Sequence, residues 1–326
     1  YYRDGAFKTY FLMFIRAPQK PASEYSGTDL FSVDAAGINS GSGPGFEASH
    51  RVDIAFEIPT TGSGFGRYLA SRLTGQGYMF TTNTDAEATG TSLHWDFDTG
   101  WLVPFATASN YSSFMFKRTP GFVDSITYEG TGSATTKSHM LNAVPEMIWC
   151  KNRETSNDGW AVYHKNADAS SPEDKYLHLN QDSAVADSNT YWNDTVPTAS
   201  VFSVGTSADV NETSEQYIAY LFSSTPGVSK VGSYTGTGSA GINVDCGFSA
   251  GARLVLIKRS DSSGDWYFFY SIVAGNDSYL LLNTATAAVT STDYIDPLNA
   301  GFTVQATSSE TGLNASGGNY IFLAIA

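Results

Sequence analysis

A stretch of fifteen residues occurs twice in this chain, and this repetition constrains the fold more than any other feature of the sequence. The copies read TPGFVDSITYEGTGS at residues 119–133 and TPGVSKVGSYTGTGS at residues 225–239, so they lie 106 residues apart (225 − 119 = 106). Downstream, two further matching segments end at Trp160 and Trp266 with the same spacing. This period corresponds to a whole domain and exceeds the roughly 20–50 residues of solenoids and propellers. The sequence therefore predicts tandem domains of one type.

A strand-like segment that ends near a proline marks the expected boundary between these domains. It recurs at about residues 10–18, 111–120 and 217–226, and a fourth copy at 319–326 stops before any proline. Because proline cannot extend a hydrogen-bonded ladder, each proline is expected to end one domain and begin the next. The first copy is expected to be the last strand of a preceding repeat or a strand donated to the first domain. The predicted division is 1–18, 19–118 (a diverged first repeat), 119–225 and 226–326.

Short apolar segments separated by turn residues predict strands. In both clear repeats an apolar segment is followed by a Gly/Asp/Ser turn and by a second segment opened by Trp160 or Trp266, which is a hairpin pattern. No segment of about ten residues or more keeps a helical spacing without interruption. The sequence predicts an all-β protein made of tandem β-sandwich domains, jelly-roll or lectin-like, of about 100 residues each. The residues expected to determine this fold are the two tryptophans and Gly130, Gly132, Gly236 and Gly238.

Charge and hydropathy narrow the set of expected partners. Charged residues make up 15% of the 326 residues, and the formal net charge at pH 7 is −14. An acidic surface is unsuited to nucleic acid and to anionic membranes, so neither is expected as a partner. The longest purely apolar run, YFLMFI, has six residues, far fewer than the roughly 20 that a spanning helix needs.

The two cysteines are not expected to form a disulfide. Cys150 and Cys246 fall in different repeats, and Cys150 aligns with Ile257 in an apolar strand segment. Free cysteine is among the residue types most often buried. Both are therefore predicted to be buried free thiols, and the disulfide framework of a small secreted domain is absent.

One pair of carboxylates is the strongest catalytic candidate. Asp96 and Asp98 lie two residues apart in HWDFDTGW. On a strand they would share a face at about 7 Å, which overlaps the carboxylate spacing of inverting glycosidases. A solvated turn explains the pair better, and no counterpart occurs in the other repeats. The chain is therefore not expected to be an enzyme, and no catalytic residue is assigned.

Metal and cofactor signatures are also missing from the sequence. No HxH or HExxH spacing occurs among the five histidines, which are His50, His94, His139, His164 and His178. No metal site is therefore predicted. The glycine-rich stretches at 62–66 and 130–133 lack the Lys-Ser/Thr of a phosphate loop, so no nucleotide or other cofactor is expected.

Several aromatic residues are candidates for stacking on sugars. These are Trp95, Trp101, Tyr191 and Trp192. Large aromatic side chains dominate protein cores as well as binding surfaces, and a core position is the better explanation for each. Ligand-binding residues are therefore left unassigned.

The order of the repeated segments resembles a tandem domain of tail-fibre and other virion structural proteins of tailed bacteriophages, especially marine and cyanobacterial phages. The resemblance rests on SHMLNAVPEMIWCKNR, KYLHLN, YWNDTVPTASVFSVG and YIAYLF in the second repeat and on their counterparts in the third. It covers residues 119–326 well and residues 1–118 more loosely. The resemblance implies a β-rich virion component and supplies no catalytic residue.

This resemblance leads to a functional expectation. The chain is expected to be a structural virion component, in a tail fibre or appendage, whose string of adhesive domains reaches toward host-surface glycans. Expected partners are copies of itself in a homotrimer and other virion proteins bound through a region upstream of residue 1. Assembly is expected in the cytoplasm of the bacterial host.

Two alternatives remain open at this point. One is a capsid-surface decoration or a passive fibre spacer without a ligand. The other is a polysaccharide depolymerase that uses Asp96 and Asp98. Exposed aromatic side chains in loops would favour adhesion, whereas Ser/Thr loops would favour a spacer.

Overall fold

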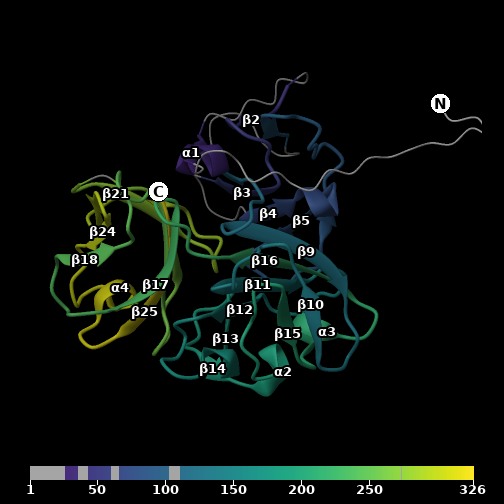
Figure 1. Cartoon of the computed structure of the whole chain (residues 1–326). Helices are drawn as coiled ribbons and strands as arrows, with labels where there is room; N and C mark the ends of the chain where they lie inside the picture. The colour runs from purple at the N-terminus through teal and green to yellow at the C-terminus, as the bar shows by residue number, and fades with distance from the viewer. Residues whose placement is uncertain (1–25, 36–42, 60–65, 103–110, 273) are drawn as a thin grey trace, which may run out of the picture.

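The computed structural model describes residues 26–35, 43–59, 66–102, 111–272 and 274–326 of the chain (Figure 1). The strand-like segment predicted at about residues 10–18 and the first predicted domain boundary lie outside the described residues. Within the described residues the helices are one turn long and all longer elements are strands, which confirms the predicted all-β class. No described helix has the length and apolar character needed to cross a membrane.

Three six-stranded antiparallel sheets form the body of the molecule, and each takes its strands from one continuous part of the chain. We call these parts unit 1, unit 2 and unit 3. In spatial order, the unit 1 sheet contains β1 (Phe31–Asp34), β8 (Tyr111–Phe116), β3 (Ile54–Pro59), β4 (Tyr68–Ser71), β5 (Gly77–Phe80) and β6 (Ala88–Thr89). The unit 2 sheet contains β9 (Val123–Glu129), β16 (Gln216–Phe222), β11 (Met147–Asn152), β12 (Ala161–His164), β13 (Lys175–His178) and β14 (Ala186–Asp187). The unit 3 sheet contains β17 (Ser229–Thr235), β25 (Asn319–Ile325), β19 (Leu254–Arg259), β20 (Trp266–Ser271), β21 (Asp277–Leu281) and β22 (Val289–Thr292).

The three large sheets share one topology. In each, the first strand of the unit pairs with its last strand, and four successive strands continue the sheet from there. A small sheet covers the outer face of each large one. The small sheets are β2 (Phe46–Glu47) with β7 (Gly100–Trp101), β10 (Thr135–Ser138) with β15 (Val201–Val204), and β18 (Ile242–Asp245), β24 (Gly301–Val304) and β23 (Ile295–Leu298). The helical turns are α1 (Gly27–Leu30), η1 (Arg72–Thr74), η2 (Pro172–Asp174), α2 (Asn189–Trp192), α3 (Ala208–Asn211) and α4 (Thr311–Asn314).

The repeated Thr-Pro-Gly segments form the turns at which units 2 and 3 begin. The backbone N–H of Phe122 donates to the carbonyl of Thr119 at 3.0 Å, and the equivalent bond in unit 3 is 2.9 Å long. Gly121 and Gly227 have φ angles of +84° and +71°. Proline at the second position and a positive φ at the third are what a type II β-turn requires. The repeat in the sequence is therefore a repeated chain reversal between units.

Each large sheet is buried on both faces. The outer faces form three separate cores under the small sheets, one in each unit. The inner faces meet in a single central core to which all three units contribute. Within it, the ring of Phe56 from unit 1 lies 5.6 Å from Trp149 of unit 2 and 6.2 Å from Phe268 of unit 3, measured between ring centroids.

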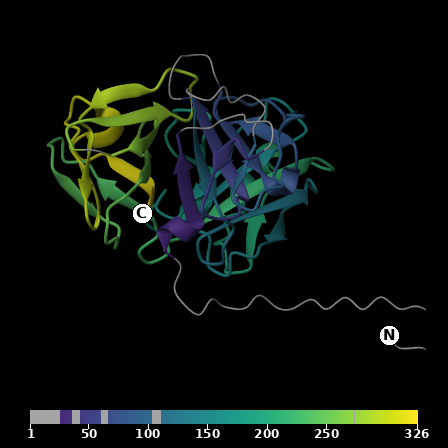
Figure 2. The same ribbon diagram turned by 90° about the horizontal axis from the view of Figure 1, so that it is seen from above.

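The units are therefore not arranged as the extended string that the sequence led us to expect. In Figure 1 unit 1 lies above unit 2, and in Figures 1 and 2 unit 3 lies to one side of both. Because the inner faces of all three sheets share one core, separating the units would expose large apolar side chains to water. Tandem repetition here produces a packed three-unit body rather than length.

Equivalent hydrogen bonds join consecutive units. The indole Nε1 of Trp160 in unit 2 donates to the carbonyl of Phe80 in unit 1 at 2.8 Å. The indole Nε1 of Trp266 in unit 3 donates to the carbonyl of His178 in unit 2 at 2.9 Å. Trp160 directly precedes β12 and Trp266 is the first residue of β20, and these are the second hairpin strands of their units, so the predicted equivalence of the two tryptophans is confirmed.

The third boundary closes the arrangement into a ring. Arg67, directly before β4 as Trp160 is before β12, donates from Nη2 to the carbonyl of Thr286 in unit 3. Thr81 of unit 1 donates from Oγ1 to the carbonyl of Leu282 in unit 3 at 2.9 Å. Unit 1 thus contacts unit 3 as unit 3 contacts unit 2 and unit 2 contacts unit 1.

Candidate functional site

The carboxylate pair that was the strongest catalytic candidate lies on the surface. Asp96 and Asp98 are both exposed and belong to an irregular segment between Trp95 and β7. Since this segment is not a strand, it does not provide the common strand face on which the glycosidase spacing depended. A solvated turn accounts for both residues.

The four aromatic residues considered as sugar platforms are buried. Their relative exposures are 6% for Trp95, 1% for Trp101, 8% for Tyr191 and 2% for Trp192. Trp95 and Trp101 stack on each other with 5.0 Å between ring centroids, and Nε1 of Trp101 donates to Oγ of Ser113 at 2.8 Å. The core interpretation of all four is confirmed, and none is available to stack on a ligand.

The cysteines behave as predicted. Both are free and buried. Burial raises the pKa of the Cys150 thiol to about 12, and its Sγ lies 2.9 Å from Oη of Tyr128. A thiol with such a pKa is not a nucleophile at neutral pH.

The histidines do not assemble into a metal centre in the part of the chain that the structure describes. There, no group of three or more His, Cys, Asp or Glu side chains is placed to hold a metal ion. His94 is exposed, whereas His50, His139 and His164 are at most 5% exposed.

A polar cluster in unit 2 was not predicted from the sequence. Oδ2 of Asp209 in α3 lies 2.8 Å from Nε2 of His178 and accepts a hydrogen bond from Oη of Tyr191 at 2.8 Å. Burial alone would raise the pKa of Asp209, but the hydrogen bonds from His178 and Tyr191 lower it. The backbone N–H of Gly159 donates to its other oxygen at 2.5 Å. Every partner is within the unit, so this carboxylate fixes α3 against the large sheet.

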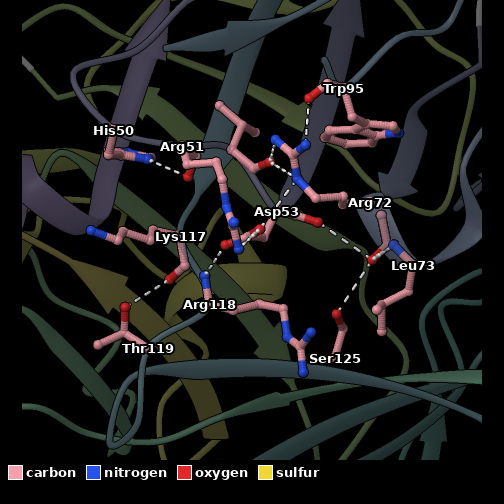
Figure 3. Close-up of polar contacts among 12 residues, drawn as sticks. His50, Arg51, Asp53, Arg72, Leu73, Trp95, Lys117, Arg118, Thr119 and Ser125 are labelled. Carbon is pink, nitrogen blue, oxygen red and sulfur yellow. Dashed lines mark hydrogen bonds and ion pairs between the residues drawn. The ribbon is translucent and has the colours of Figure 1, made fainter. Parts of the chain in front are cut away.

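The ends of units 1 and 2 are each held by a carboxylate, as Figure 3 shows for Asp53. Oδ1 of Asp53 lies 3.2 Å from Nη2 of Arg51 and 3.3 Å from Nε of Arg72, and Oδ2 accepts the backbone N–H of Arg118 at 3.0 Å. Oγ of Ser71 lies 3.3 Å from Oγ of Ser125 across the boundary to unit 2. This network joins the last strand of unit 1 to the first strand of unit 2.

An equivalent polar network, made of different residues, joins unit 2 to unit 3. Glu146 accepts the backbone N–H of Ser224 at 2.8 Å and the ammonium of Lys165 at 2.6 Å. Burial on its own would raise the pKa of Glu146, but the bonds from Lys165 and Ser224 lower it. Because the arrangement recurs at both boundaries, we assign these charged residues to connecting the units rather than to chemistry.

His164 occupies the boundary between units 2 and 3 and is completely buried. Its Nδ1 accepts the backbone N–H of Asn166 at 3.1 Å, so Nε2 carries the proton and donates to the carbonyl of Phe322 in unit 3 at 3.3 Å. Burial lowers the pKa of His164 to about 4. The neutral imidazole is therefore the form that the folded chain holds at neutral pH.

We expect acid to destabilise the chain through His164. Between the unfolded pKa of about 6.5 and the folded pKa of about 4, the unfolded chain binds a proton that the folded chain excludes, so stability falls as pH falls. The expected loss over this interval is about 3 kcal/mol. Urea unfolding at pH 7, 5 and 4 should show a smaller loss in His164→Gln than in the wild type. Equal losses in the two proteins would contradict this role.

A surface cleft lies between units 2 and 3. It is a cleft of about 340 Å³ bounded by β17, by β18 and by the Lys165–Asn166 turn that follows β12. Its lining combines ammonium, amide, hydroxyl and carboxylate groups, from residues that include Lys230, Ser233, Asn243 and Asp245. It has no equivalent in the sequence predictions, because it depends on how two repeats pack.

Comparison with known proteins identifies the family. A search of curated proteins finds no match to this chain. Residues 70–326, which include the strands from β5 to β25, match the family described as a domain of unknown function, DUF7483. This match covers most of the 326 residues. The chain therefore belongs to the DUF7483 family.

Proposed function

We propose that this chain is a non-enzymatic structural component of a tailed-bacteriophage virion, in a tail fibre or appendage. The observation that carries the proposal is the closed ring of three similar units around one core. Asp53 and Glu146 hold one unit to the next, and Asp209 holds α3 to the large sheet of unit 2.

The proposed partners follow from the resemblance to phage structural proteins. The chain contacts copies of itself in a homotrimer, and it contacts other virion proteins. Its proposed location is the virion, after assembly in the host cytoplasm. A negative charge of −14 supports solubility at the high copy number of a virion protein.

A passive spacer or a capsid-surface decoration is the second candidate, and one observation favours it. The exposed large apolar side chains of the described residues are Val33, Leu73, Met140, Val144, Val196 and Val289, with no aromatic among them. Adhesion through aromatic platforms is therefore not supported, and an adhesive role has to rely on polar groups.

Labelling of particles tests the proposed location. Antibodies raised against the purified chain should decorate tail fibres in electron micrographs of intact phage. Decoration of the capsid would support the second candidate, and absence of label from particles that contain the protein's peptides by mass spectrometry would contradict surface exposure on either. Sedimentation of the purified chain should give a trimer.

Digestion assays test the non-enzymatic role. The purified chain should release no reducing ends from host envelope polysaccharide over many hours. Release that disappears in Asp96→Asn or Asp98→Asn would overturn the proposal and restore the depolymerase alternative.

A further inference from the structure

The cleft between units 2 and 3 lies beside two strands that have only one neighbour each. β17 is the edge strand of the unit 3 large sheet, and β18 is the edge strand of its small sheet. Lys165 and Asn166 of unit 2 form the third wall. The edge of a sheet presents backbone N–H and C=O groups that no neighbouring strand satisfies, so it can bind another molecule.

In unit 2 the equivalent sheet edge, β9, is covered by a lysine side chain. Lys137 on β10 pairs in register with Phe202, donates from Nζ to the carbonyl of Glu129 at 2.8 Å, and lies 4.6 Å from the ring centroid of Tyr128. Its ammonium therefore covers the end of β9. Lysine is one of the residues by which proteins protect sheet edges.

Unit 3 lacks this cover. The position that corresponds to Lys137 is Val244, which pairs in register with Phe302 and is 7% exposed. The corresponding tyrosine, Tyr234, has the same stacking on its partner strand as Tyr128 and forms one wall of the cleft. The cleft is therefore open at the position where unit 3 has the short, apolar Val244 and unit 2 has Lys137.

The polar groups around the opening are accessible. Asn166, Ser233, Asn243 and Asp245 are exposed, and Lys230 is half-buried. The ammonium of Lys230 has no hydrogen-bond or ion-pair partner within the described part of the chain.

Two of the lining residues already have one polar partner each. Oδ1 of Asn243 accepts a hydrogen bond from Oγ1 of Thr303 at 2.8 Å, and its Nδ2 makes no hydrogen bond within the described part of the chain. Lys165 is neutralised by Glu146 at 2.6 Å. Lys230 is therefore the cation in the lining that has no carboxylate bound to it.

We infer that this cleft binds a saccharide unit that carries a carboxylate, such as a uronic acid residue of an acidic polysaccharide. The carboxylate lies against Lys230 in a charge-assisted hydrogen bond, and the ring hydroxyls exchange hydrogen bonds with Asn166, Asn243 and Asp245. The volume of about 340 Å³ falls at the lower end of the range of small-molecule sites. Donors and acceptors around a polar lining match a hydroxyl-rich ligand rather than an apolar one. This inference rests on the proposed virion function, which it extends to a ligand class.

A substitution copied from unit 2 provides the main test. In Val244→Lys the new side chain should cover the edge of β17 as Lys137 covers β9, closing the cleft without removing any polar group that lines it. Lys230→Gln removes the proposed carboxylate partner and keeps the cleft open. Lys175→Gln is the matched control, because Lys175 is paired with Asp187 on β14 and does not line the cleft.

Titration calorimetry with trigalacturonic acid and with neutral galactotriose, on the full chain, measures the outcome. We expect wild type and Lys175→Gln to bind trigalacturonic acid with a dissociation constant of about 1 mM, typical of a single weak site. Lys230→Gln should weaken this binding roughly tenfold, the loss of one charge-assisted bond, and leave the neutral sugar unaffected. Val244→Lys should bind neither sugar. If Val244→Lys does not fold, the comparison of sugar binding by Lys230→Gln and by the wild type decides the test.

Four results would overturn the inference. These are wild-type binding in Val244→Lys that has a native circular dichroism spectrum, unchanged binding of trigalacturonic acid in Lys230→Gln, equal affinity of the wild type for the charged and neutral sugars, and no binding of either sugar by the wild type. The virion proposal is tested separately by particle labelling, so its failure would be recognised even if the sugar binds. Conversely, antibody labelling of fibres together with no sugar binding would refute only the proposed saccharide site in the cleft.

Discussion

Replacing Phe56 by alanine is expected to lower the free energy of unfolding by about 3–5 kcal/mol, the usual cost of removing a buried phenylalanine ring. Phe56 is 2% exposed in the central core and contacts aromatic rings of both other units. The cavity left behind would border units 1, 2 and 3 together. We therefore expect the whole chain to unfold in one transition at a lower urea concentration.

Phe46→Ala is the matched control for this experiment. Phe46 is also fully buried, but it lies in the outer core of unit 1, stacked on Trp101 at 6.4 Å. Amide hydrogen exchange should show faster opening of β11 and β20 in Phe56→Ala, whereas Phe46→Ala should affect mainly β2 and β7. If Phe56→Ala leaves exchange in units 2 and 3 unchanged, the central core does not couple the units.

A second large effect is expected from two equivalent asparagines. Asn211 is fully buried; its Nδ2 donates to the carbonyls of Ser133 and Gly205, each at 2.7 Å, and its Oδ1 accepts the N–H of Thr131 at 2.9 Å. Asn211→Ala would leave three backbone groups without their partner. At about 1–3 kcal/mol for each buried unsatisfied group, we expect a loss of at least about 3 kcal/mol.

Asn314 provides an internal replicate in unit 3. Its Nδ2 donates to the carbonyls of Ser239 and Ala306 at 2.9 and 2.6 Å, and its Oδ1 accepts the N–H of Thr237 at 2.8 Å. Chemical denaturation should give similar losses for Asn211→Ala and Asn314→Ala. The exposed neighbour Glu212→Ala should change stability by less than about 0.5 kcal/mol. A loss below 1 kcal/mol in either asparagine variant would refute the assigned role.

The fold class and the equivalence of the repeats were predictable because both follow from local sequence patterns. The turn sequence Thr-Pro-Gly recurs at residues 119 and 225, and the apolar strands keep their order after it. β11 is buried along its whole length, which is typical of a strand covered on both faces. Its sequence, MIWCKN, therefore contained a signal for a second covering layer.

The identity of that second layer was not predictable from one sequence. The ring of Phe56 meets Phe268, and no local pattern connects residues so far apart in the chain. The tryptophans at 160 and 266 were recognised as equivalent, but their indole donors bind carbonyls of a different unit, which spacing does not reveal.

The candidate sites were less predictable than the fold. Asp96 and Asp98 were noticed because they are close in sequence, yet the structure leaves them in a turn on the surface. The polar cluster of unit 2 joins His178 and Asp209, which lie 31 residues apart. The cleft depends on Val244 replacing a lysine, and this difference has meaning only when the strands of two units are compared.

Because the ring is closed, it limits how the number of units in such a chain can change. Each unit already uses one boundary for the unit before it and one for the unit after it, including the contact of Arg67 and Thr81 with unit 3. A single duplicated unit would find no vacant boundary, whereas a solenoid accepts one repeat at a time. Duplication of this architecture is therefore expected to succeed in sets of three, so that a longer protein would be a row of complete rings.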